Sequence, residues 1–152
     1  MTIKEYLILI KKTFPYLFKK YEFKVVYSEE YRPGYGWFKI GLESKTCRIL
    51  FVREQGGGIM FLGPIDAPFN NEDDDRWVVA LTLLAYLLKK KWDWRFLDKL
   101  HPKDSAFAWL SYNARELEPF CGQVLEMFRS SEIIAEWKPA YKKYLRENAK
   151  WS

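Results

Sequence analysis

The change of apolar spacing at Phe23, from a helical period to a period of two, constrains the fold of this chain most strongly. After it, four short apolar segments are expected to be strands: Phe23–Tyr27, Trp37–Leu42, Cys47–Arg53 and Ile59–Leu62. They are separated by a Pro/Gly loop and two turns: Glu29–Gly36, Glu43–Lys45 and Gln55–Gly58. Connections this short join only antiparallel neighbours, because a parallel crossover needs about a dozen residues or more. The sequence therefore predicts a four-stranded antiparallel meander.

A helix is predicted before this sheet. Thr2 and Glu5 have the spacing of a capping box, in which side chains satisfy free backbone N–H groups at the start of a helix. Pro15 disfavours helical geometry at the residue before it, so we expect a break or kink at Phe14. A short continuation, Tyr16–Tyr21, then leads into the first strand.

Another helix is predicted after the sheet, over the apolar segment Trp77–Leu88. Asn70 or Asn71 is its candidate N-cap, Glu72–Asp75 would lie at its positive end, and Lys89–Lys91 would lie at its negative end. The segment is apolar nearly all round, which is typical of a helix buried between a sheet and other helices. We expect it to be the centre of the core.

Helical patterns continue to the end of the chain. A short helix is expected up to Leu100, one from Ala106 is kinked or split by Pro119, and one from residue 130 or 131 is interrupted by Pro139. No repeat or linker divides the sequence. The expected fold is a single α+β domain over residues 1–152, with the meander packed on a central buried helix between an N-terminal helix and a C-terminal helical layer.

Composition indicates a globular chain, with 49% hydrophobic and 30% charged residues. The two cysteines, Cys47 and Cys121, do not make a disulfide framework and are expected to be reduced. The N-terminus lacks the features of a signal peptide. The longest apolar stretch is shorter than the roughly twenty residues that span a bilayer. We therefore expect a cytoplasmic protein without a membrane partner.

The net charge of +5 is spread unevenly along the chain. Residues 1–24 contain six lysines against two glutamates, whereas residues 25–75 contain nine acidic and five basic side chains. Nucleic-acid binders usually gather their excess charge on one face. The alternation along this sequence makes its basic pI a weak indication of an anionic partner.

Two motifs are candidates for holding a metal or a phosphate. Glu72–Asp75 supplies the oxygen ligands that hard cations prefer, but consecutive residues point around a helix end, and the helix dipole accounts for them. Gly56–Gly58 is not followed by the lysine and hydroxyl residue of a phosphate loop, and it continues into a strand. We expect a hairpin turn there, and neither a metal nor a cofactor.

Catalytic candidates are equally sparse. His101 could form a nucleophilic pair with Cys47 or Cys121, which requires an approach that sequence does not reveal. Glu43 and Lys45 have the acid-x-Lys spacing of some metal-dependent nucleases, but they fall in a predicted turn, and the second carboxylate would have to come from the loop upstream. No catalytic residue is predicted. A non-enzymatic role is favoured over an uncharacterised hydrolase or nuclease.

Aromatic residues are unusually abundant, with 7 Trp, 10 Tyr and 11 Phe. Two groups combine them with arginine and supply the candidate partner-binding residues: Tyr31, Arg32, Tyr35 and Trp37 in the first, and Trp92, Trp94 and Arg95 in the second. Aromatic and Arg side chains anchor protein interfaces. They also stack the bases of single-stranded nucleic acids. The third interpretation is that they complete a bulky core.

The segment from residue 21 to about residue 91 has a recognisable order. It runs Tyr-Glu-Phe, strand, aromatic-Gly loop, strand ending Leu-Glu-Ser, strand Arg-Ile-Leu-Phe-Val-Arg-Glu, Gly turn, strand, Pro-rich loop and apolar helix. In this order it resembles small uncharacterised bacterial α+β proteins, some of which are linked to toxin systems as immunity proteins. The resemblance implies a cytoplasmic protein-binding role that neutralises a toxin, and it carries no functional residue over to this chain.

These observations favour a non-enzymatic protein-interaction module of the immunity-like kind. Its partner would be a protein, and the resemblance implies a toxin. The alternative is a nucleic-acid-binding protein that uses the lysines of residues 4–24 and 89–91 together with the aromatic surface. A homodimer that buries the excess of aromatic side chains also remains open.

Overall fold

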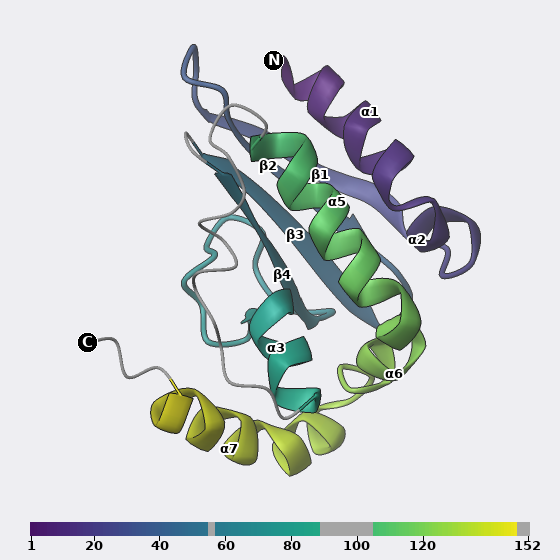
Figure 1. The fold of residues 1–152 in the computed structure, drawn as a ribbon, viewed down its shortest axis with the longest axis vertical. Coiled ribbons are helices and arrows are strands. Elements are labelled where there is room, and N and C mark those ends of the chain that lie inside the picture. The colour runs from purple at the N-terminus through teal and green to yellow at the C-terminus, as the bar shows by residue number, and fades with distance from the viewer. Residues whose placement is uncertain (55–56, 89–104, 149–152) are drawn as a thin grey trace.

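The computed structural model describes residues 1–54, 57–88 and 105–148 (Figure 1). Five strands form one antiparallel sheet in chain order: β1 (Lys24–Arg32), β2 (Trp37–Glu43), β3 (Cys47–Glu54), β4 (Gly57–Pro64) and β5 (Val78–Val79). The helices are α1 (Ile3–Thr13), α2 (Pro15–Lys19), α3 (Ala80–Leu87), α5 (Ser105–Leu117), the 3-10 helix η2 (Glu118–Phe120), α6 (Cys121–Glu126) and α7 (Ser131–Asn148). Among these helices, none is long and apolar enough to cross a membrane. The α+β class and the antiparallel meander are confirmed, with a two-residue fifth strand added.

The first strand is longer than its sequence pattern indicates. A loop is predicted from Glu29, but β1 continues to Arg32. Tyr27, Glu29 and Tyr31 are half-buried, and the residues between them are exposed, so the period of two continues to the end of the strand. β1 lies at the edge of the sheet, where Ser28, Glu30 and Arg32 are exposed and polar. Their polarity gives the end of the strand the composition of a loop.

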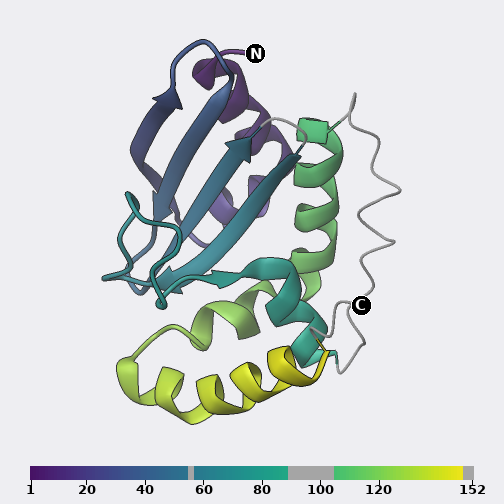
Figure 2. The ribbon, with the colours of Figure 1, turned by 90° about the vertical axis from the view of Figure 1, so that its left-hand side faces the viewer.

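One face of the sheet carries the larger core, against α1 and α5 (Figure 2). Alternate residues of the three central strands are buried on it: Phe38, Ile40, Leu42, Ile49, Phe51, Met60 and Leu62. Phe14, between α1 and α2, packs edge-on against Phe51, with ring centroids 5.2 Å apart. The period of two in each strand delivers these side chains to one face, and their removal from water stabilises the layer.

The other face of the sheet, which we call the second face, is covered in part by residues 65–77, the connection between β4 and β5 (Figure 2). Its buried residues are Leu50, Val52, Ala67, Phe69 and Trp77. The Trp77 indole N–H donates to the Pro68 carbonyl at 2.7 Å, a hydrogen bond that joins two parts of the connection. Because β3 is covered on both faces, Ile49–Val52 is a continuous apolar run instead of an alternating one.

The buried helix predicted over Trp77–Leu88 begins later than expected. α3 starts at Ala80, and the two valines before it form β5, which pairs with Phe61 and Leu62 of β4. The outer edge of β4 offers backbone partners there, and valine favours extended geometry. The candidate caps at positions 70 and 71 therefore cap no helix, and Glu72–Asp75 lies in the connection instead of at a helix N-terminus. Lys89–Lys91 lies outside the described residues.

The N-terminal helix begins and ends as predicted. The Glu5 backbone N–H donates to the Thr2 hydroxyl at 3.1 Å, which satisfies one free donor of the first turn. α1 ends at Thr13, and α2 begins at Pro15. Phe14 between them is not helical, with φ −117° and ψ 55°, as the proline requires.

The two prolines of the C-terminal helices behave differently. Pro119 separates α5 from α6 by a short 3-10 turn, which confirms the predicted split. α7 passes through Pro139 without interruption, so the predicted break there is wrong. Pro139 and Ala135 are both exposed, so water can satisfy the Ala135 carbonyl that loses its helical partner. The helix expected up to Leu100 lies outside the described residues.

Candidate partner-binding site

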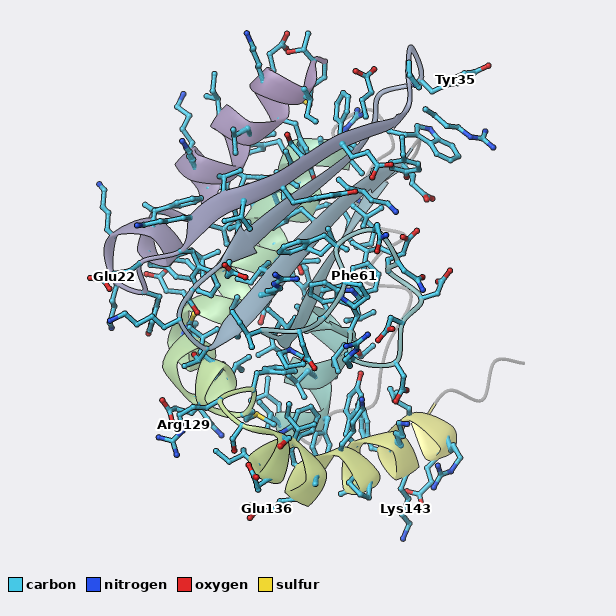
Figure 3. The ribbon with its side chains drawn as sticks, turned by 180° about the vertical axis from the view of Figure 1, so that it is seen from behind. Glu22, Tyr35, Phe61, Arg129, Glu136 and Lys143 are labelled. Carbon is cyan, nitrogen blue, oxygen red and sulfur yellow. The ribbon has the colours of Figure 1, made fainter. Side chains whose placement is uncertain are left out.

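The β1–β2 hairpin carries four of the predicted partner-binding residues, which we call the hairpin cluster: Tyr31, Arg32, Tyr35 and Trp37. Arg32 and Trp37 are paired across the two strands. The turn between them contains two glycines with positive φ, Gly34 at 88° and Gly36 at 70°, a geometry that glycine adopts readily. Tyr35 lies at the tip of the turn, is 67% exposed and projects away from the sheet (Figure 3).

Trp37 is the centre of the hairpin cluster. The Arg32 guanidinium carbon lies 4.5 Å from the Trp37 ring centroid, and the Tyr31 ring centroid lies 5.5 Å from it. The Trp37 indole N–H is buried and has no hydrogen-bond acceptor among the described residues. A buried donor without an acceptor costs about 1–3 kcal/mol. The cluster thus combines a preset cation–π pair with a buried indole N–H that lacks an acceptor among the described residues.

Tyr31 connects the hairpin cluster to the second face. Its hydroxyl donates to the Glu54 carboxylate at 3.0 Å, and the Lys39 ammonium lies 5.0 Å from its ring centroid. Burial, and then the hydrogen bond to Glu54, raises the pKa of Tyr31. Lys39 is only 6% exposed and pairs with Glu72 at 2.6 Å. Desolvation alone would raise the pKa of Glu72, but the Lys39 hydrogen bond and charge, with a backbone hydrogen bond, lower it overall.

The second predicted group, Trp92, Trp94 and Arg95, lies outside the described residues. The same is true of His101, so the structure gives no geometry for a Cys–His pair. Cys47 and Cys121 are buried, and burial raises the pKa of both thiols, in the case of Cys121 to about 12. A protonated thiol is a poor nucleophile and metal ligand. The surroundings of these cysteines therefore favour a packing role.

The acidic run Glu72–Asp75 does not converge on one point. Glu72 pairs with Lys39, Asp74 with Arg76, and Asp75 with Lys138 and Lys142 of α7: the shortest N–O distances are 2.6, 2.9 and 3.1 Å. Hydrogen bonds from Arg76 lower the pKa of Asp74 to about 2. Within the described ranges, no three His, Cys, Asp or Glu side chains are placed to hold a metal ion. Separate ion pairs, and not a helix dipole, account for Glu72, Asp74 and Asp75.

The remaining motifs have ordinary structural roles. Glu43 accepts a hydrogen bond from Arg48 at 2.8 Å, while Lys45 is exposed in the β2–β3 turn. Gly57 and Gly58 lie in β4, which continues as a strand and does not lead into a helix as a phosphate loop does.

Two further surfaces have no signal in the sequence pattern, and a third, the basic one, was predicted from it. A cavity of about 920 Å³ is lined by residues near 18–26, by the β2–β3 turn and by α6, and its charges are mixed. A groove of about 400 Å³ runs beside β4 on the second face. The exposed lysines of α1, α2 and the start of β1 form a basic surface: Lys4, Lys11, Lys12, Lys19, Lys20 and Lys24. The cavity and the groove combine segments that the chain order separates, so only the fold brings them together, whereas the lysines all lie within residues 4–24.

Comparison with known proteins adds no family to this geometry. No protein-family model, curated protein or solved structure matches the chain. The resemblance of residues 21–91 to small bacterial immunity-like proteins therefore stays a prediction. The function must be argued from the described residues themselves.

Proposed function

We propose that the protein is a non-enzymatic protein-interaction module whose contact surface is centred on the hairpin cluster. The observation that carries this proposal is Tyr35, 67% exposed at the hairpin tip beside the Arg32–Trp37 cation–π pair. A large aromatic side chain held in solvent by a tight turn contributes nothing to the core. Its exposure is accounted for by contact with another molecule.

The chemistry of the hairpin cluster fits a protein partner. Tyr, Trp and Arg are the residue types most enriched where interface binding energy is concentrated. Arg32 is already stacked on Trp37, so part of the ordering cost of binding is met before the partner arrives. We infer a protein toxin as this partner, which follows from the immunity-like resemblance of residues 21–91.

The proposal predicts that Arg32→Ala/Tyr35→Ala lowers partner affinity at least about 30-fold, since two hot-spot residues contribute more than about 2 kcal/mol together. The measurement is an affinity pull-down from the native host with the tagged protein, followed by titration of the protein recovered. Arg129→Ala/Lys143→Ala is the matched control, because both side chains are exposed at the opposite end of the molecule (Figure 3). Equal recovery by the wild type and the hairpin variant would contradict the proposal.

A second function is supported by the basic surface. The six lysines of residues 4–24 are all exposed, and none forms an ion pair within the part of the chain that the structure describes. Glu5 and Glu22 are the only acidic residues in the sequence from 1 to 24. Unpaired lysines attract phosphate backbones by counterion release, independently of nucleotide sequence.

This alternative predicts that a fluorescent 20-nucleotide single strand binds at 50 mM salt and loses at least about tenfold in affinity at 200 mM. Lys11→Glu/Lys12→Glu should lower the affinity further and flatten the salt dependence. Fluorescence polarisation measures both effects, with Lys143→Glu/Arg146→Glu at exposed positions of α7 as the control for net charge. Absence of binding at 50 mM salt would remove the nucleic-acid function.

A further inference from the structure

The groove on the second face is built from four segments of the chain. β3 contributes Val52 and Glu54, β4 contributes Gly57, Gly58, Ile59 and Phe61, the β4–β5 connection contributes Glu72 and Asp73, and α5 contributes Trp109. Its volume is about 400 Å³, and every lining residue belongs to the described part of the chain. We call it the Trp109 groove.

The floor of the Trp109 groove is apolar. Ile59 is 46% exposed, and Phe61 and Trp109 are half-buried, so a ligand would remove further apolar surface from water. The Trp109 ring lies directly against the β4 backbone: a Cβ added at Gly57 would be 2.8 Å from its Nε1. The glycine therefore lets the indole form one wall of the groove.

The rim of the Trp109 groove is acidic. Glu54 accepts the Tyr31 hydroxyl and has no ion pair, and the Asp73 carboxylate has no ion pair either, within the described residues. Glu72 is neutralised by Lys39. Among the described residues, two carboxylates without an ion-pair partner thus line the rim of an aromatic floor, where a cation gains from both the carboxylates and the ring faces.

The β4 edge beside the groove is paired over only part of its length among the described residues. β5 pairs with only two residues of β4, Phe61 and Leu62. In the described part of the chain, Gly57–Met60 has no strand on its outer side. An unpaired strand edge can hydrogen-bond to an extended peptide segment.

We propose that the Trp109 groove binds an extended, Lys- or Arg-bearing segment of the partner protein. The cationic head group lies between Glu54 and Asp73, and its aliphatic stem packs on Phe61 and Trp109. This inference rests on the proposed function and names the chemistry of its partner. The Tyr31–Glu54 hydrogen bond makes the groove continuous with the hairpin cluster, so one partner can cover both.

The test is a selection that uses no native partner. The full-length protein is immobilised, and a phage-displayed random heptapeptide library is selected on it at 50 mM salt. Enriched peptides are expected to carry Lys or Arg among apolar residues. Synthetic copies of them should bind Glu54→Gln/Asp73→Asn about tenfold more weakly than the wild type, since two charge contacts are lost. Glu132→Gln/Glu136→Gln makes the same change of net charge on the exposed side of α7 and should leave the affinity unchanged.

Three results would overturn the inference: no enrichment, enrichment of peptides without Lys or Arg, or equal loss of affinity in the α7 control. Thermal unfolding of each variant verifies that the groove substitutions leave the fold intact. Failure of the proposed function is separable from failure of the inference. If the proposed function fails, the hairpin variant recovers as much native protein as the wild type does. If only the groove inference fails, the peptide selection gives no Lys- or Arg-bearing peptide, but the wild type still recovers more native protein than the hairpin variant.

Discussion

Gly41→Ala is expected to lower the free energy of unfolding by about 2 kcal/mol, through overpacking of the second face. A Cβ at position 41 would lie 2.6 Å from two ring carbons of Phe69 and 2.8 Å from the Tyr27 Cβ. The Tyr27 and Phe69 rings stack at 5.4 Å and 15° directly over this glycine. Phe69 has little freedom to move away, because the Arg48 guanidinium carbon is 4.4 Å from its ring centroid and the Trp77 ring is 5.9 Å away.

Urea unfolding monitored by circular dichroism measures this effect. Gly122→Ala in α6 is the matched control, since its Cβ would be 3.4 Å from the Tyr21 hydroxyl, a contact that a small shift relieves. The helical preference of alanine over glycine, about 1 kcal/mol, should leave that variant as stable as the wild type or slightly more so. Wild-type stability of Gly41→Ala would mean that residues 65–77 do not pack on the second face as described.

Glu72→Ala is expected to cost about 2–3 kcal/mol, somewhat less than the roughly 3–5 kcal/mol lost when one partner of a fully buried ion pair is removed. The variant leaves the Lys39 ammonium, whose side chain is 8% exposed, without its carboxylate partner. The expected loss of stability is smaller than for a fully buried pair because the Glu72 side chain is 27% exposed. Lys39→Met/Glu72→Gln removes the buried charge together with its partner and should regain most of the lost stability.

The same ion pair makes a prediction about pH. The pKa of Glu72 is lowered in the folded protein, so its contribution to stability is complete above its unfolded-state pKa of about 4.3 and is lost as pH falls through the lower, folded-state value. The difference in unfolding free energy between wild type and Glu72→Ala should therefore be constant from about pH 5 to 7 and shrink below about pH 4. A difference that grows as pH falls would contradict the assignment of this pair.

The meander could be predicted from sequence because short connections leave antiparallel pairing as the only choice. The cap at Thr2 and the splits at Pro15 and Pro119 were equally local, and all three are confirmed. β5 was not predictable, since two valines before an apolar helix fit either period and their pairing partners, Leu62 and Phe61, are 16 and 18 residues earlier in the chain. α7 continues through Pro139 because this side of the helix faces water. The spacing of residues along the sequence does not reveal which side that is.

The candidate site divides in the same way. The hairpin cluster was predictable because its four residues lie within seven consecutive positions of one hairpin. The Lys39–Glu72 pair joins residues 33 positions apart, and the Trp109 groove joins β3 to α5. Such sets share no spacing rule, because they depend on how the connection over residues 65–77 lies across the sheet. The anchor of the proposed surface was therefore predictable from the sequence, whereas the grouping of its acidic half was not.

Site-specific photocrosslinking at position 35 tests the central claim most directly. Tyr35 is replaced by p-benzoylphenylalanine, the protein is irradiated in native-host extract, and Glu136 on α7, at the opposite end of the molecule, is replaced in the same way as control (Figure 3). The account predicts one dominant protein adduct at position 35 that is absent at position 136 and is lost when Arg32→Ala is added. Irradiation that yields no adduct at position 35, or the same adducts at both positions, would contradict a partner surface at the hairpin.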